Sequence, residues 1–190
     1  NWFLASPDPN VSIGVKADPI KVEMIVRAYL LGSAWKGYNE KGMRNLCGNE
    51  LPEDMREFQP FDSLLLTPTT KALKGHDENI TPHEIFENGL ASEREYAEMS
   101  RLALKLFARG REIARQKGLE QGDTKYEFGR LVTGQVVVID EVNTPDSSRY
   151  YYRDQFLAYT GEKKDVRPEE LSKEFVRDWL REQGYTGEED

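Results

Sequence analysis

The sequence predicts an α+β fold in which an antiparallel β-sheet is flanked by helices. Hydrophobic residues recur at helical spacing between 92 and 118. Runs rich in β-branched residues occupy 22–31 and 124–142, and a turn inside the second run favours antiparallel pairing. The chain has 190 residues, 38% of them hydrophobic, which is enough to bury one core. We therefore expect a single domain over 1–190.

Capping residues mark where the predicted helices begin and end. Ser92 and Glu95 form the S-x-x-E pattern, in which the two side chains satisfy backbone N–H groups of the first turn. Gly118 follows at the position where a left-handed residue ends a helix. Two further helices are predicted at 81–89 and 168–183. The segment 37–68 mixes Gly, Pro and charged residues, and we expect loops and short edge strands there.

Charge and composition exclude several classes of function. The 26 Lys and Arg residues face 34 Asp and Glu, a net charge of −8, so we expect no nucleic acid and no membrane as a partner. No apolar run approaches the ~20 residues that span a bilayer, and no signal pattern opens the chain, which favours a cytoplasmic location. One cysteine, Cys47, and two histidines, His76 and His83, are too few for a zinc site. A bound metal would need carboxylates.

The strand run at 124–142 predicts a hairpin that brings two carboxylates together. If Thr133 and Gly134 form a two-residue loop, Glu127 lies directly opposite Asp140, with Lys125 on the same face. Opposed carboxylates repel unless a positive group lies between them, either a divalent cation or Lys125. A nucleotide-bound Mg²⁺ is one interpretation. A solvated hairpin face in another register is the alternative.

Two further segments point to anion binding. Arg27 lies within an apolar strand pattern, where it needs either an anionic ligand near Ser33 or a structural ion pair. The segment 140–149 gathers acids, hydroxyls and an arginine directly after a strand. It is either an anion-binding loop or an ordinary capped turn.

Five motifs in order along the chain resemble one known family. They are VRAYLLGSAW at 26–35, TPTTK at 67–71, GHDE at 75–78, DTKYEFG at 123–129 and DEVNTPDSSR at 140–149. Together they resemble the phosphoribosylaminoimidazole-succinocarboxamide synthases, the SAICAR synthetases of purine biosynthesis. The segment 171–180 also resembles the family's late helix, so the likeness covers almost the whole chain.

The resemblance implies a SAICAR synthase-like fold, with a large lobe of the ATP-grasp or kinase-like kind, and an ATP-dependent ligase. In that reaction ATP phosphorylates the carboxylate of carboxyaminoimidazole ribonucleotide, and the amine of L-aspartate displaces the phosphate to form an amide. The resemblance assigns Mg²⁺ to Glu127 and Asp140, and the nucleotide and reacting phosphate to Lys125. It makes Lys125 and Asp140 the catalytic residues. It assigns the ribonucleotide phosphate to Arg27 and Ser33.

The resemblance adds further substrate contacts, namely Lys71, His76, Asp77, Ser148 and Arg149, the last to either the ribonucleotide or aspartate. Family members also carry an N-terminal subdomain that covers ATP, and this subdomain is absent here, so we expect the chain alone to have little ligase activity. A Mg-nucleotide phosphotransferase and a non-catalytic binding module are the alternatives. A homo-oligomer is a further expectation, because aromatic residues such as Trp35 could form subunit contacts.

Overall fold

The computed structural model describes residues 3–71, 77–161 and 165–185. Its strands are β1 (Phe3–Asp8), β2 (Val11–Gly14), β3 (Asp18–Tyr29), β4 (Asn45–Leu46), β5 (Asn49–Glu50), β6 (Pro60–Leu66), β7 (Thr69–Thr70), β8 (Leu119–Arg130), β9 (Val136–Ile139) and β10 (Ser148–Tyr152). Its helices are α1 (Gly32–Lys41), α2 (Pro82–Glu87), α3 (Glu93–Gln116), α4 (Arg153–Ala158) and α5 (Glu174–Glu182). The predicted α+β class is confirmed.

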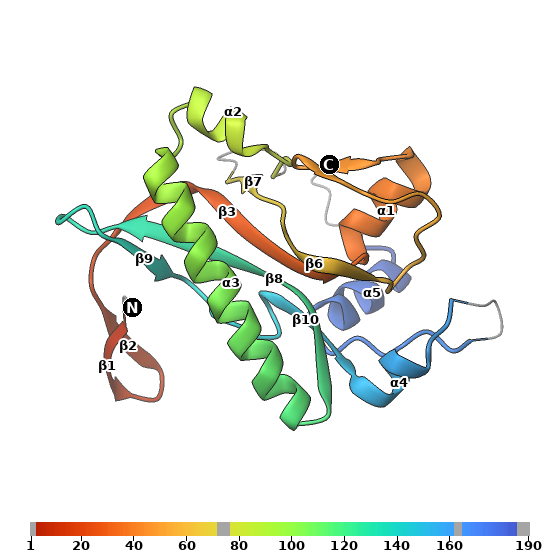
Figure 1. The fold of residues 1–190 in the computed structure, drawn as a ribbon. Coiled ribbons are helices and arrows are strands. Elements are labelled where there is room, and N and C mark those ends of the chain that lie inside the picture. Colours follow the sequence, from red (N-terminus) through yellow and green to blue (C-terminus); the bar gives the residue numbers. More distant parts are fainter. Residues whose placement is uncertain (1–2, 72–76, 162–164, 186–190) are drawn as a thin grey trace.

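A six-stranded antiparallel sheet organises the chain. Its main path runs β10-β8-β3-β6, while β7 pairs with β3 and β9 pairs with β8. The long strands β3 and β8 lie side by side at its centre, and Figure 1 shows α3 crossing one face of both. None of the helices in the described part of the chain is long and apolar enough to cross a membrane.

The hydrophobic core lies between α3 and this face of the sheet. Met99, Ala103 and Phe107 recur on one side of α3 and are fully buried. They pack in one cluster with strand residues that include Tyr126 and Phe128 of β8. Fully burying side chains of this size contributes about 1.5–3 kcal/mol each, so α3 is held mainly by its apolar stripe. The predicted capping box at the start of α3 is present.

Helix α2 matches its prediction, whereas the last helix is shorter than predicted. Thr81 caps α2 with a full capping box, and Pro occupies an early helical position. The helix predicted at 168–183 begins only at Glu174. The preceding residues run along the edge strand β10 instead, since the Leu171 N–H donates to the Tyr150 carbonyl (2.7 Å). The apolar face expected on this helix is exposed, with Trp179 55% accessible.

The segment 37–68 contains the predicted loops and short strands, with β6 at an edge of the sheet. It contains the end of α1 and the strands β4, β5 and β6. A second apolar cluster holds these elements together, in which Tyr38, Leu46 and Met55 are buried. Helix α1 begins at Gly32, and its N-cap residue Leu31 offers no side-chain hydrogen bond, so the sequence gives no start signal there.

The hairpin between β8 and β9 has a three-residue loop, so the predicted register is wrong by one residue. The Gly134 N–H donates to the Leu131 carbonyl (2.8 Å), and the Leu131 N–H donates to the Gln135 backbone carbonyl (2.9 Å). Gly134 has φ +80°, the left-handed conformation that completes a type I turn followed by a bulge. Glu127 therefore pairs with Ile139, and Asp140 lies one residue beyond the ladder.

Candidate functional site

A cleft of about 470 Å³ opens on the side of the sheet opposite α3. Such a volume lies within the ~300–1,000 Å³ of typical small-molecule sites. Strands β3 and β8 contribute Arg27, Asp123 and Lys125, and α1 contributes Ser33. Further walls come from the loop after β9 and from α5. Because successive residues of a strand point to opposite faces, the same strands that supply the core to α3 supply charged groups to this cleft.

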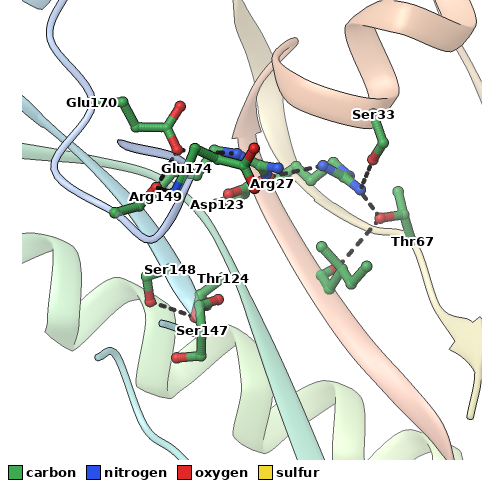
Figure 2. A network of polar contacts seen from close by, with 12 residues as sticks. Arg27, Ser33, Thr67, Asp123, Thr124, Ser147, Ser148, Arg149, Glu170 and Glu174 are labelled. Atoms are coloured by element: carbon green, nitrogen blue, oxygen red, sulfur yellow. Dashed lines mark hydrogen bonds and ion pairs between the residues drawn. The ribbon is translucent and has the colours of Figure 1, made fainter. Parts of the chain in front are cut away.

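Two arginines share one buried aspartate in this cleft. Asp123 Oδ2 lies 2.8 Å from Arg27 Nη1 and 2.7 Å from Arg149 Nη1. Figure 2 shows the two guanidinium groups approaching this carboxylate from different sides. Arg27 also donates to the hydroxyls of Thr67 (3.0 Å) and Ser33 (3.3 Å). On its other side Arg149 Nε lies 3.5 Å from Glu170 Oε1, so the two guanidinium groups are balanced by two carboxylates.

Burial and mutual repulsion act on these arginines. Burial lowers the pKa of Arg27 despite the opposing charge of Asp123, whereas Asp123 raises the pKa of Arg149. Both stay protonated at neutral pH because arginine starts from a very high value. Of the two interpretations of Arg27, the structural ion pair is observed, and Arg27 also lines the cleft where an anion would lie.

Gly32 provides the space for Arg149. It has φ +58°, and a Cβ added there would lie 2.8 Å from Arg149 Cζ. Any other residue would therefore combine backbone strain with a clash against the guanidinium.

An alternating row of acids and lysines lies beside the arginine cluster. Lys125 Nζ lies 2.6 Å from Glu23 Oε1 and 3.2 Å from Glu127 Oε1. Lys71 also forms an ion pair with Glu127, and Thr69 donates to Glu23 (3.1 Å). Glu23 and Glu127 are neighbours across the β3–β8 ladder. Lys125 thus lies between Glu127 and Glu23, and not between Glu127 and Asp140 as the predicted hairpin register implied.

The pKa values in this row favour the charged forms. Burial lowers the pKa of Lys125, but Glu23 and Glu127 together outweigh it and raise the pKa above its ordinary value. Burial raises the pKa of Glu127, but Lys71 and Lys125 outweigh it and bring the pKa below its ordinary value. Lys125 and Glu127 are therefore both charged at neutral pH.

Sequence reasoning missed Glu23 and Asp123 as members of the site. Both are only 3% exposed. Glu23 lies in the same apolar strand run as Arg27, so the signal that identified Arg27, a charge inside a buried strand, applied to it equally. Asp123 is the first residue of the DTKYEFG motif at 123–129, but the resemblance assigns it no role.

A second cavity, of about 610 Å³, adjoins this row of acids and lysines at the hairpin between β8 and β9. Its lining includes Lys71, Glu127, Asp140 and Glu141. Although Glu127 and Asp140 are not paired across the ladder, both reach this cavity. Asp140 is exposed and has φ +59°, a left-handed conformation that aspartate tolerates better than most residues. Glu127 and Asp140 therefore line one cavity, although the register of the hairpin differs from the predicted one.

The donor set in this cavity fits magnesium better than zinc. Within the described residues, no three His, Cys, Asp or Glu side chains are grouped closely enough to hold a metal ion by themselves. Magnesium keeps several waters and is commonly held by one or two carboxylates together with substrate phosphates. Glu127 and Asp140 supply two such carboxylates, and a magnesium ion at Glu127 would replace Lys71 or Lys125, which contact its two oxygens.

The remaining predicted residues line one of the two cavities or lie outside the described residues. Asp77 and Ser148 line the cleft. The Ser148 hydroxyl lies 2.7 Å from the Thr124 hydroxyl, so this contact holds the loop to β8. Lys71 reaches the second cavity rather than the first. His76 lies outside the residues that the structure describes.

Comparison with known proteins then identifies the family. The family model of the SAICAR synthetases matches residues 1–190, the whole chain. The chain belongs to the SAICAR synthetase family. Over 189 residues it is 50% identical to the phosphoribosylaminoimidazole-succinocarboxamide synthase of Azobacteroides pseudotrichonymphae, and over 190 residues 50% identical to that of Bacteroides fragilis. Both alignments cover 100% of this chain, which spans 57% and 59% of the two relatives' lengths.

Solved structures of the family share the fold. The SAICAR synthase of Saccharomyces cerevisiae complexed with SAICAR superposes with a TM-score of 0.72 at 37% identity, covering 90% of this chain and 53% of that chain. A type-2 SAICAR synthetase in complex with ADP gives a TM-score of 0.71 at 22% identity, covering 100% of this chain and 72% of that chain, and shows the fold. The resemblance found in the sequence is confirmed at the level of family and fold.

Proposed function

We propose that this chain carries the ribonucleotide site and the metal side of the nucleotide site of an ATP-dependent ligase. The enzyme would join carboxyaminoimidazole ribonucleotide and L-aspartate, giving SAICAR, ADP and phosphate. One observation carries the proposal: two adjoining cavities are linked by the ion-paired row of Lys71, Glu127 and Lys125. Six Lys and Arg side chains and five Asp and Glu side chains line the first cavity, whereas one lysine and three Asp and Glu side chains line the second. A phosphate-bearing substrate and a magnesium nucleotide need such complementary neighbours.

The arginine cluster is the proposed site for the ribonucleotide phosphate. Asp123 orients both guanidiniums while leaving N–H groups of each free to meet an anion. The Ser33 hydroxyl, on the exposed start of α1, would complete the contact. Of the two assignments that the sequence left open for Arg149, its shared carboxylate with Arg27 supports the ribonucleotide.

The hairpin cavity is the proposed metal site. Glu127 and Asp140 would hold Mg²⁺, which, when bound, supplies positive charge to the transferring phosphoryl group. Lys125 lies between the two cavities and would face the reacting phosphate from the protein side. Its ammonium is fixed by Glu23 and Glu127, so it is oriented before the substrate arrives.

The proposed reaction has two steps. A carboxylate oxygen of the ribonucleotide attacks the γ-phosphorus of ATP, which forms an acyl phosphate and releases ADP. The aspartate amine then attacks the acyl carbon, the C–O bond to phosphate breaks, and the nitrogen loses a proton as the amide forms. Lys125 would stabilise the negative charge that builds on the transferred group in the first step. Asp77, at the cleft wall, is our candidate contact for the imidazole or aspartate.

We assign turnover to the longer protein. Since this chain spans 57–59% of the first two relatives, we expect it to bind ligands while turning over little ATP. The relatives named above are synthases, so the phosphotransferase alternative is not favoured. Cytoplasmic location and homo-oligomerisation stay predictions.

Calorimetric titration of the 190-residue chain with carboxyaminoimidazole ribonucleotide tests the phosphate site. Ser33→Ala and Arg149→Gln should weaken binding, the second by about 10- to 150-fold, because a hydrogen bond to a charged group contributes about 1.5–3 kcal/mol. Ser63→Ala and Arg101→Gln are matched controls, because both residues are exposed and neither lines the cleft. Wild-type affinity in both site variants would refute the assignment.

A second titration, with Mg·ADP, tests the metal site. Glu127→Gln and Asp140→Asn should each lose magnesium-dependent nucleotide binding, and Glu112→Gln, on the exposed side of α3, should not. Nucleotide binding that is unaffected by all three substitutions would refute the metal site and leave the ribonucleotide site standing.

A further inference from the structure

We infer that Asn143 is a positioning residue that holds the loop 140–148 in place between the two cavities. This role deepens the proposed function and rests on it. The loop contributes Asp140 to the hairpin cavity at one end and Ser148 to the arginine cleft at the other. A residue that fixes the middle of this loop therefore sets the geometry of both proposed sites at once.

The Asn143 amide makes contacts with two elements of the core. Its Oδ1 accepts hydrogen bonds from the hydroxyl of Tyr126 (2.6 Å) and from Nε2 of Gln121 (3.0 Å), both on β8. Its Nδ2 donates to the Leu106 carbonyl of α3 (3.3 Å). The backbone carbonyl of Asn143 accepts a hydrogen bond from the Tyr150 hydroxyl (2.7 Å). One side chain thus ties the loop to the central strand and to the long helix.

The Leu106 carbonyl fixes the direction of these bonds. Because a carbonyl can only accept, the Asn143 amide nitrogen must face α3 and the amide oxygen must face β8. The Tyr126 hydroxyl, whose pKa burial raises, then donates to that oxygen. Asn143 itself has φ +56°, a conformation that few side chains other than Asn and Asp adopt readily. Backbone and side chain requirements both favour asparagine.

Gly110 on α3 supplies the room for this amide. A Cβ added at Gly110 would lie 2.4 Å from Asn143 Nδ2 and 2.7 Å from its Cγ. Glycine inside a helix costs about 0.5–1 kcal/mol relative to alanine. The contact with Asn143 gives a physical reason for glycine in the interior of an otherwise strongly helical segment.

Two backbone hydrogen bonds hold the far end of the loop, at Ser147 and Ser148. The Ser147 carbonyl accepts from the Lys125 N–H (3.0 Å), and the Ser148 N–H donates to the Thr144 carbonyl (2.9 Å). These bonds place Ser147 and Ser148 at the cleft beside Lys125. Release of the middle of the loop from α3 would loosen them, because Thr144 follows Asn143 directly.

Amide hydrogen exchange on the 190-residue chain tests the positioning role without any ligand. In Asn143→Ala, exchange of the Lys125 and Ser148 amides should accelerate about tenfold, as expected for the loss of roughly 1.4 kcal/mol of local stability. The amide of Asn88, the C-cap residue of α2, donates to the Glu84 carbonyl and should keep its wild-type rate. Asn39→Ala, an exposed change on α1, is the matched control. Unchanged loop exchange, or a uniform acceleration in α2 as well, would overturn the inference.

A double-variant cycle makes the test specific to the Gly110 contact. Gly110→Ala should accelerate the same loop amides although Asn143 is retained, because the new methyl displaces the amide from α3. In Gly110→Ala/Asn143→Ala the methyl enters vacated space, so exchange should be no faster than in Asn143→Ala alone. Additive effects of the two changes would contradict the inference.

Ligand binding by the same variants separates this inference from the proposed function. Asn143→Ala should weaken both carboxyaminoimidazole ribonucleotide and Mg·ADP about tenfold at a temperature where the variant is fully folded. A wild-type chain that binds neither ligand would refute the proposed function, while the exchange data would still decide the role of Asn143. A wild-type chain that binds both, with Asn143→Ala equal to it, would overturn the positioning role alone.

Discussion

Replacing Asp123 by asparagine should cost this chain a large part of its stability. The side chain keeps its shape, but the one carboxylate between Arg27 and Arg149 loses its charge. The Arg27 side chain is 3% exposed and Asp123 4%, so water cannot replace the lost partner. Breaking a buried pair by removing one partner costs about 3–5 kcal/mol. For a domain of this length that corresponds to a fall of roughly 6–20 °C in Tm.

Urea unfolding followed by circular dichroism measures this loss. The matched control is Glu112→Gln, which breaks the exposed pair with Arg109 and should change the free energy of unfolding by less than about 0.5 kcal/mol. Inorganic phosphate should stabilise Asp123→Asn more than the wild type, because Arg27 then lacks an anionic partner and Arg149 keeps only Glu170. At 100 times its Kd the gain would be about 2.7 kcal/mol. A loss below about 1 kcal/mol for Asp123→Asn, with no phosphate effect, would refute the reasoning.

Three further predictions concern single residues. Gly32→Ala should weaken ribonucleotide binding and destabilise the chain by about 1–2 kcal/mol, seen by titration and urea unfolding, because φ is +58° and the Cβ meets Arg149. Arg130 holds the pKa of Glu95 at about 2, below the unfolded value of ~4.3, so its stabilisation is complete above about pH 5 and lost toward pH 2. The stability of Glu95→Gln should therefore fall less than wild type between pH 6 and pH 3, and an equal fall would argue against this pair. Burial raises the pKa of the Cys47 thiol to about 11, so iodoacetamide at pH 8 should label it only after urea unfolding, and rapid native labelling would contradict its burial.

Local signals predicted the helices well where the chain carries explicit start and stop residues. The capping boxes at Ser92 and Thr81 are present, and each helix begins one residue later. Helix α1 has no such cap and was missed. The last helix was predicted to start too early, because its amphipathic pattern continues through residues that hydrogen-bond to the edge strand β10. Tertiary pairing of this kind leaves no trace in local periodicity.

The candidate site shows a different limit of sequence reasoning. Arg27 could be singled out, because a charge in an apolar strand needs a partner, but nothing local identifies Asp123, which lies 96 residues further along the chain. The pairing of Glu127 with Asp140 failed because a three-residue loop looks like a two-residue loop until the bond between Gly134 and Leu131 is seen. Long-range partners and loop geometry both depend on the assembled fold.

The two-sided character of β8 has an evolutionary consequence. Asp123, Lys125 and Glu127 face the cavities, while Tyr126 and Phe128 face the core. A one-residue insertion or deletion in this strand would exchange the two faces beyond the point of change, placing charges under α3 and aromatic rings in the clefts. Such a change would destroy folding together with ligand binding. We therefore expect selection against insertions and deletions in β8, and tolerance of them in the surface loops of the chain.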